Sequence, residues 1–114
     1  MDDNCLFCKI AAGIIPVEKL YEDEEIIAFS DIAPQAPVHF LVIPKKHIAG
    51  PAAIGQDDEH LLGRALRVAA QIAKKEGIGD QYRLVTNNGT EAGQTVFHLH
   101  LHVLGGRTMQ WPPG

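Results

Sequence analysis

The sequence predicts an α+β domain: a five-stranded, mostly antiparallel sheet packed by one long and one short helix. Five short stretches of β-branched or alternating apolar residues are separated by turn residues, which is typical of strands. The segment 57–76 instead repeats its apolar residues at the spacing of an amphipathic helix. Hairpin-like connections between most of the strands favour antiparallel pairing.

The composition indicates a single globular domain over 1–114. With 46% hydrophobic and 21% charged residues, the 114-residue chain can bury a core without disulfides. Its net charge of -4 argues against electrostatic binding to nucleic acid. The sequence contains no run of about 18 apolar residues, so we expect no membrane span. The Met1–Asn4 start lacks the features of a secretory signal, so we expect a cytoplasmic protein with no nucleic-acid or membrane partner.

A short helix is expected over 5–12, capped by Asn4 and ended by Gly13. It opens with Cys5-Leu6-Phe7-Cys8, a Cys-x-x-Cys motif. In a chain without an export signal, we expect reduced thiols rather than a structural disulfide. The motif fits zinc ligation, redox chemistry or coincidence, and zinc would need about two further ligands from the histidines.

Three strands are expected before the long helix, over 17–21, 26–29 and 38–43. The acidic run 22–25 fits a solvated turn better than a metal site. Asp31 opens a loop with two prolines, where it either satisfies loop amides or accepts the hydroxyls of a ribose. His39 lies in the third strand, and its spatial neighbours decide whether it is structural or functional.

The long helix 57–76 is expected to be scaffold, capped by Asp57 or Asp58 and ended by Gly77. A fourth strand follows over 82–86. The polar loop 87–94 contains two glycines and can present backbone N–H groups to an anion.

The stretch 95–104 is expected to form the fifth strand and to carry the chemistry. His98, His100 and His102 recur at every second position, so on a strand they share one face, with successive side chains about 7 Å apart. The opposite, buried face would hold the intervening apolar residues Phe97, Leu99, Leu101 and Val103.

Three aligned histidines fit three functions. They can bind a catalytic metal, supply a nucleophile for phosphorus with neighbours that hold the anionic substrate, or serve a structural or non-catalytic nucleotide-binding role. Asn87, Thr95 and the loop amides add neutral donors suited to a phosphate oxygen. No carboxylate cluster lies near in sequence to orient three metal-bound imidazoles, so the surroundings favour the nucleophile.

Residues 94–107, Gln-Thr-Val-Phe-His-Leu-His-Leu-His-Val-Leu-Gly-Gly-Arg, resemble the His-φ-His-φ-His-φ-φ signature of the histidine triad (HIT) superfamily. The Trp-Pro-Pro-Gly ending and the segment 31–39 are similar to its Hint branch, the histidine triad nucleotide-binding proteins, and the similarity covers about 5–114. The resemblance implies a HIT-like fold that dimerises into a ten-stranded sheet, with the tail 105–114 at the interface. Trp111, the only tryptophan, is expected to pack on a surface such as the partner.

The same resemblance implies a purine nucleoside phosphoramidate hydrolase that releases AMP or GMP through a covalent nucleotidyl-histidine. By matching positions, His100 is the nucleophile and the His98 carbonyl sets its tautomer. His102 and Thr95 would bind the α-phosphate, with Thr95 near the leaving amine, and His39 would be the supporting fourth histidine. The remaining implied nucleotide contacts are Asn87 and the backbone of Gly93 and Gln94 for phosphate, Asp31 for ribose, Phe7, Ile10, Phe29 and Ile32 for the base, and Trp111 in the tail.

Two features depart from many members of the family. Thr95 stands where serine is usual, and its extra methyl group would alter leaving-group tolerance. Members that carry the Cys-x-x-Cys hold a zinc ion, and the matching ligands here are Cys5, Cys8, His47 and His98. This set of two sulfurs and two nitrogens is that of a closed structural zinc site, which would leave catalysis metal-independent.

The alternatives are a dinucleoside polyphosphate hydrolase of a sister branch and a purine nucleotide-binding module with little turnover. The Trp111 tail favours the Hint branch over the sister branch.

Overall fold

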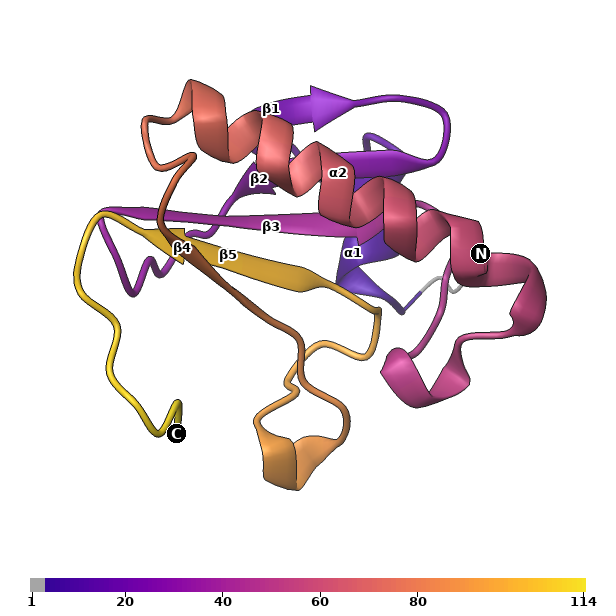
Figure 1. Cartoon of the computed structure of the whole chain (residues 1–114). Helices are drawn as coiled ribbons and strands as arrows, with labels where there is room; N and C mark the ends of the chain where they lie inside the picture. The colour runs from indigo at the N-terminus through magenta and orange to yellow at the C-terminus, as the bar shows by residue number, and fades with distance from the viewer. Residues whose placement is uncertain (1–3) are drawn as a thin grey trace.

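A computed structural model describes residues 4–114 and confirms the α+β class (Figure 1). The first three residues of the Met1–Asn4 stretch, from which we expect no secretory signal, lie outside the described residues. One sheet has the strand order β1-β2-β3-β5-β4, and every neighbouring pair is antiparallel. The strands are β1 (Lys19–Glu22), β2 (Ile26–Ser30), β3 (Val38–Pro44), β4 (Tyr82–Val85) and β5 (Leu101–Gly105). No helix among the described residues has both the length and the apolar character that crossing a membrane requires.

The two helices cover opposite faces of the sheet (Figure 1). The long helix α2 (Glu59–Lys75) packs on one face through Ala65, Ala69 and Ile72. That face presents Ile26, Ala28, Phe40, Val42, Leu101 and Val103. The short helix α1 (Leu6–Ala11) packs on the other face, which presents Ile27, Phe29, Leu41 and Ile43.

The strand register places histidines on the face that α1 covers. Leu41 faces α1 and pairs directly with His102 in β5. Because side chains alternate along a strand, His39, two residues before Leu41, belongs to the same face. The short helix therefore lies over the sheet where two of the predicted site residues meet.

The fifth strand is shorter than the sequence predicts. β5 begins at Leu101, so His98 and His100 precede the paired strand. Pro44 gives a physical reason, because it ends β3 without an N–H to donate and its carbonyl oxygen lies 2.7 Å from Nε2 of His98.

The expected burial of Phe97 is also wrong, because 49% of this side chain is exposed. Leu99 is buried as predicted, but in a separate small cluster with Ile48 and Leu61. Its N–H donates to the carbonyl oxygen of Ile48 at 2.6 Å, not to a neighbouring strand. The other four strands begin and end within two residues of the predicted positions.

The N-cap of α1 differs from the predicted one, whereas α2 has the predicted N-cap residue without its side-chain bond. The N-cap of α1 is Cys5, whose Sγ accepts the N–H of Cys8 at 3.3 Å, rather than Asn4. Asp58 occupies the N-cap position of α2 without a side-chain cap bond to that helix. Its carboxylate instead accepts the N–H of Gly55 at 3.1 Å and pairs with Lys46 at 2.5 Å. Gly77, with φ +83°, confirms the predicted end of α2.

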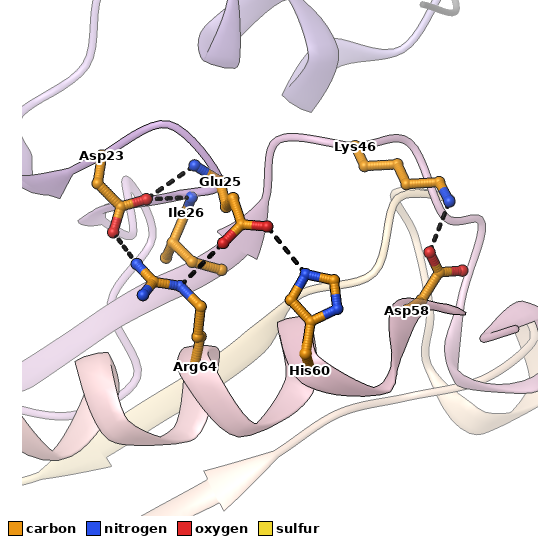
Figure 2. A network of polar contacts seen from close by, with 7 residues as sticks. All are labelled: Asp23, Glu25, Ile26, Lys46, Asp58, His60 and Arg64. Atoms are coloured by element: carbon orange, nitrogen blue, oxygen red, sulfur yellow. Dashed lines mark hydrogen bonds and ion pairs between the residues drawn. The ribbon is translucent and has the colours of Figure 1, made fainter. Parts of the chain in front are cut away.

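The acidic turn between β1 and β2 is tied to α2 by ion pairs (Figure 2). Asp23 accepts the amides of Glu25 and Ile26 and pairs with Arg64. Glu25 pairs with Arg64 at 3.2 Å and with His60 at 2.9 Å. The turn that the sequence predicts to be solvated thus connects the edge of the sheet to α2 through its acidic side chains.

Candidate active site

The imidazoles of His100, His102 and His39 form a row, and Phe7 of α1 connects this row to the ring of His98. The ring centroids of His100 and His102 are 4.9 Å apart, and those of His102 and His39 are 5.2 Å apart. Phe7 of α1 contacts the rings of His98 and His100, with centroids 6.0 Å and 5.0 Å away. The structure therefore brings together the triad and the His39 that lies about 60 residues earlier in the sequence.

The hydrogen bonds of His100 fix its tautomer. Its Nδ1 lies 2.7 Å from the backbone carbonyl oxygen of His98. A carbonyl can only accept, so Nδ1 carries the proton and Nε2 keeps a free lone pair. The backbone carbonyl of His100 in turn accepts the hydroxyl of Thr86 at 2.9 Å. Sequence reasoning missed Thr86, which showed only as the last residue of a predicted strand.

A second chain of hydrogen bonds fixes the opposite tautomer in His102. The backbone N–H of Gln35 donates to Nδ1 of His39 at 3.0 Å, so a neutral His39 carries its proton on Nε2. That Nε2 lies 3.0 Å from Nδ1 of His102, which must accept. The proton of His102 is therefore on Nε2. A lone pair on His100 and an N–H donor on His102 lie on adjacent rings.

Burial keeps the rings of His102 and His39 neutral at pH 7. It lowers the pKa of His102 to about 4, aided by the neighbouring His100 and His39 and opposed by Asp31. Burial likewise lowers the pKa of His39, again opposed by Asp31. His102 is therefore a neutral donor rather than a cation.

Asp31 faces the row from the loop between β2 and β3. Its Oδ2 lies 3.4 Å from Nε2 of His39 and 4.0 Å from Nδ1 of His102. Its Oδ1 accepts the N–H of Ala33 at 2.8 Å, so this carboxylate both satisfies a loop amide and faces the site. Ile32, the predicted base contact beside it, is 93% exposed. The three groups are close enough to share a metal, but the protonated Nε2 of His39 disfavours coordination.

The loop 87–94 leads into the segment 95–104, which we call the histidine segment. This loop contains a 3₁₀ turn, Thr90–Ala92, between two glycines with positive φ, Gly89 and Gly93. The N–H of Gly93 donates to Thr90 and that of Gln94 to Gly89, so a phosphate would share these donors with the turn. The side chain of Asn87 lies against Gly93, 3.7 Å from where a Cβ would be placed.

Thr95, the next residue of the segment, is exposed. Phe7, Ile10 and Phe29, predicted to surround a base, are buried together in the core cluster under α1. Trp111 does not pack as expected against residues 4–114 of the single chain, where it is 81% exposed.

The predicted zinc ligands converge at the other end of the row. Nδ1 of His98 lies 3.3 Å from Sγ of Cys5 and 3.5 Å from Sγ of Cys8, and Nδ1 of His47 lies 3.3 Å from Sγ of Cys8. Zn–S bonds of about 2.3 Å and Zn–N bonds of about 2.0–2.1 Å place tetrahedral ligands about 3.3–3.8 Å apart. The three distances above fit that spacing, and all four donor atoms lie within 4.8 Å of one another.

The ring of His98 is oriented for such a metal. Its Nε2–H donates to the carbonyl of Pro44, which leaves the lone pair of Nδ1 directed at the two thiols. His98 and Cys8 are at most 1% exposed, and all four tetrahedral positions would be taken by protein. These residues suit a closed structural zinc site, whose metal would crosslink α1 to the histidine segment.

Comparison with known proteins places this geometry in a family. The HIT domain model matches residues 12–109. An uncharacterised HIT-like protein from Synechocystis sp. is 54% identical over 114 residues, all of both chains. A HIT family hydrolase from Legionella pneumophila has a TM-score of 0.95 and 54% identity, covering 97% of this chain and 100% of that one. A hypothetical histidine triad nucleotide-binding protein from Sulfolobus tokodaii has a TM-score of 0.77 and 36% identity, covering 88% and 67%. The chain belongs to the HIT domain family.

Proposed function

We propose that this HIT protein hydrolyses the P–N bond of purine nucleoside 5′-phosphoramidates through a nucleotidyl intermediate on His100. One observation carries the proposal: the 2.7 Å bond from Nδ1 of His100 to the carbonyl of His98. It leaves the buried Nε2 unprotonated beside the Nε2–H of His102, which combines a nucleophile with an anion donor. Relatives described as a HIT family hydrolase and a nucleotide-binding protein support the reaction class and the ligand class.

The first step forms a bond from Nε2 of His100 to the α-phosphorus and breaks the P–N bond. The leaving amine takes a proton from solvent near the Thr95 hydroxyl. The His100 ring becomes an N-phosphorylated cation, and the carbonyl of His98 stabilises the proton that remains on Nδ1. In the second step water attacks phosphorus, releases the nucleoside monophosphate and a proton, and returns Nε2 to its unprotonated form.

The surrounding residues hold the nucleotide in this proposal. His102 donates its Nε2–H to a phosphate oxygen, assisted by Thr95 and Asn87. Asp31 accepts the ribose hydroxyls with the carboxylate oxygen that faces His39. Ile32 and the rim of the cluster that contains Phe7 contact the base.

Two further elements complete the proposal. Zinc held by the Cys5, Cys8, His47 and His98 set supports the fold, and no chemical step uses it. Two copies of the chain pair into one ten-stranded sheet, with the tail 105–114 at the interface, where the exposed Trp111 gains a surface to pack on.

The test offers adenosine 5′-phosphoramidate, guanosine 5′-phosphoramidate and diadenosine polyphosphate to the wild type and to His100→Ala. We expect the wild type to release AMP and GMP from the phosphoramidates much faster than from the polyphosphate. Acid quenching during turnover should trap one nucleotidyl group per chain in the wild type and none in His100→Ala. An undiminished variant would contradict the assigned nucleophile. Faster polyphosphate cleavage would favour a dinucleoside polyphosphate hydrolase, and nucleotide binding without turnover would favour a binding module.

A further inference from the structure

The side chain of Gln94 is one of the few polar side chains that the fold buries, with 4% of the residue exposed. Its Oε1 accepts the N–H of Gly89 at 2.8 Å. Its Nε2 donates to the carbonyls of Ala49 at 2.7 Å and Val96 at 3.1 Å. Both amide hydrogens and one acceptor position are therefore used, and no substrate atom is needed to explain the burial.

The three partners of this amide belong to separate parts of the site. Gly89 begins the 3₁₀ turn of the proposed phosphate loop. Ala49 lies two residues after the metal-ligand candidate His47, and Val96 directly follows Thr95. A single side chain thus joins the turn, the 47–50 segment and the start of the histidine segment.

The backbone near this amide is packed closely. A Cβ at Gly50 would lie 3.2 Å from Oε1 and 3.3 Å from Nε2 of Gln94, and 3.0 Å from Oδ1 of Asn88. That Oδ1 accepts the N–H of Ala52 at 2.8 Å. Two amide side chains from the loop therefore hold the 47–53 segment, and Gln94 is the buried one of the two.

We infer that Gln94 is a positioning residue for catalysis, which fixes the turn after Gly89 and the Thr95 hydroxyl relative to Nε2 of His100. This inference rests on the proposed hydrolase function. It assigns the side chain of Gln94 to the protein, whereas the sequence resemblance implies a phosphate contact for the backbone of Gln94 only. A displacement of about 1 Å at a reacting group can lower a rate about 100-fold, so a loose loop would reduce turnover without removing a substrate contact.

The variants Gln94→Leu and Gln94→Glu test the inference. Leucine keeps most of the volume and removes all three hydrogen bonds. Glutamate keeps the acceptor for Gly89 but places a carboxylate oxygen against the carbonyls of Ala49 and Val96, so it should be at least as damaging. We expect kcat for adenosine 5′-phosphoramidate to fall about 10- to 100-fold, while KM changes less than about threefold. Gln71→Leu, on the exposed face of α2, is the matched control and should retain wild-type kcat.

A double-mutant comparison separates positioning from a general loss of structure. If Gln94 acts through Thr95, Thr95→Ala should lower kcat strongly in the wild type and by less than about twofold in Gln94→Leu. An equal effect in both backgrounds would overturn the inference, as would wild-type kcat in folded Gln94→Leu and Gln94→Glu. If Gln94→Leu does not fold, the same comparison is made in Gln94→Glu.

Amide exchange gives a readout that does not depend on the reaction. The N–H of Gly89 should exchange at least about tenfold faster in the variants, with no change at Val42 in the centre of β3. Unchanged exchange at Gly89 would overturn the bracing role even in an active enzyme. A wild type that cleaves no phosphoramidate would instead refute the proposed function, and faster exchange at Gly89 would then still establish the brace.

Discussion

Nδ1 of His100 lies 2.7 Å from the backbone carbonyl oxygen of His98, and this contact separates the roles of the two histidines. The donor is the side-chain ring of His100. The acceptor is the backbone carbonyl of His98, which remains after any substitution at position 98. The ring of His98 is fully buried and faces the two cysteines. In the proposed reaction, His100 therefore acts through its side chain, and His98 orients that side chain through its backbone carbonyl.

Substitution of these two histidines should have different consequences. His100→Ala removes the proposed nucleophile, so trapped nucleotidyl-enzyme and steady-state turnover should both disappear. His98→Ala keeps the carbonyl but empties a buried site, and we expect a loss of about 2–5 kcal/mol in the free energy of unfolding, with measurable turnover remaining. Urea denaturation and single-turnover kinetics measure the two effects. Complete loss of chemistry in folded His98→Ala would contradict the backbone role.

Metal removal should destabilise the protein more than it changes the chemical step. We expect about one zinc per chain in the purified wild type, and much less in Cys8→Ser, because the Sγ of Cys8 approaches both Nδ1 atoms of the ligand set. Metal analysis by mass spectrometry and the melting temperature with and without chelator are the measurements. A metal-free wild type with an unchanged melting temperature would remove the proposed site.

The hydrogen bond from His39 should matter for turnover. His39→Phe removes the donor to Nδ1 of His102, which can then take its other tautomer and lose the Nε2–H that we propose to bind phosphate. We expect kcat to fall about tenfold or more, the size of effect associated with a positioned proton donor. His39→Gln, which retains an amide donor, should recover part of the rate. Equal rates in the two variants would argue against a role of this hydrogen bond.

Stability should decrease at mildly acidic pH because the pKa of His102 is lowered in the fold. With a folded pKa of about 4 against 6.5 for the unfolded chain, the unfolded state binds more protons between these values. The free energy of unfolding therefore falls as the pH falls from 6.5 towards 4, by about 2 kcal/mol between pH 7 and pH 5 for this group. His39 and His98, whose pKa values burial also lowers, add in the same direction.

Urea denaturation of the wild type and His102→Asn at the two pH values isolates this contribution. The variant should lose less stability between pH 7 and pH 5 than the wild type. Gln71→Leu, at an exposed position on α2, changes no titratable group and should keep the wild-type pH dependence. Identical pH dependence in the wild type and His102→Asn would contradict the prediction.

The ion pairs between the acidic turn and α2 should contribute modestly to stability (Figure 2). Arg64→Leu removes the partner of Asp23 and Glu25, but the side chain of Arg64 is 43% exposed, so we expect a loss of only about 0.5–1 kcal/mol. The loss should shrink in high salt and leave kcat unchanged. Arg67→Leu, also exposed on α2, is the control, and denaturation at two salt concentrations is the measurement. A loss that does not change with salt would point to packing instead.

Local patterns in the sequence were sufficient for most of the fold. The apolar repeat of α2 and its Gly77 ending, together with the β-branched run of β3, place elements within one or two residues of their positions. These signals work because they depend on residues close in the chain. The predicted length of the histidine strand β5 was wrong because its pairing depends on Pro44. This residue lies about 50 residues away in the sequence and ends the neighbouring strand β3.

The sequence by itself determined which chemical groups are available: three histidines at alternate positions, a Cys-x-x-Cys, and the motif that marks the family. The tertiary structure decided what each group does, since tautomer and burial depend on partners from other elements. Pro44 directs the ring of His98 to the cysteines, and the Gln35 amide acts through His39 to set the proton of His102. Every residue has a backbone carbonyl and every residue except proline has a backbone N–H, so no pattern of side chains could have revealed these contacts.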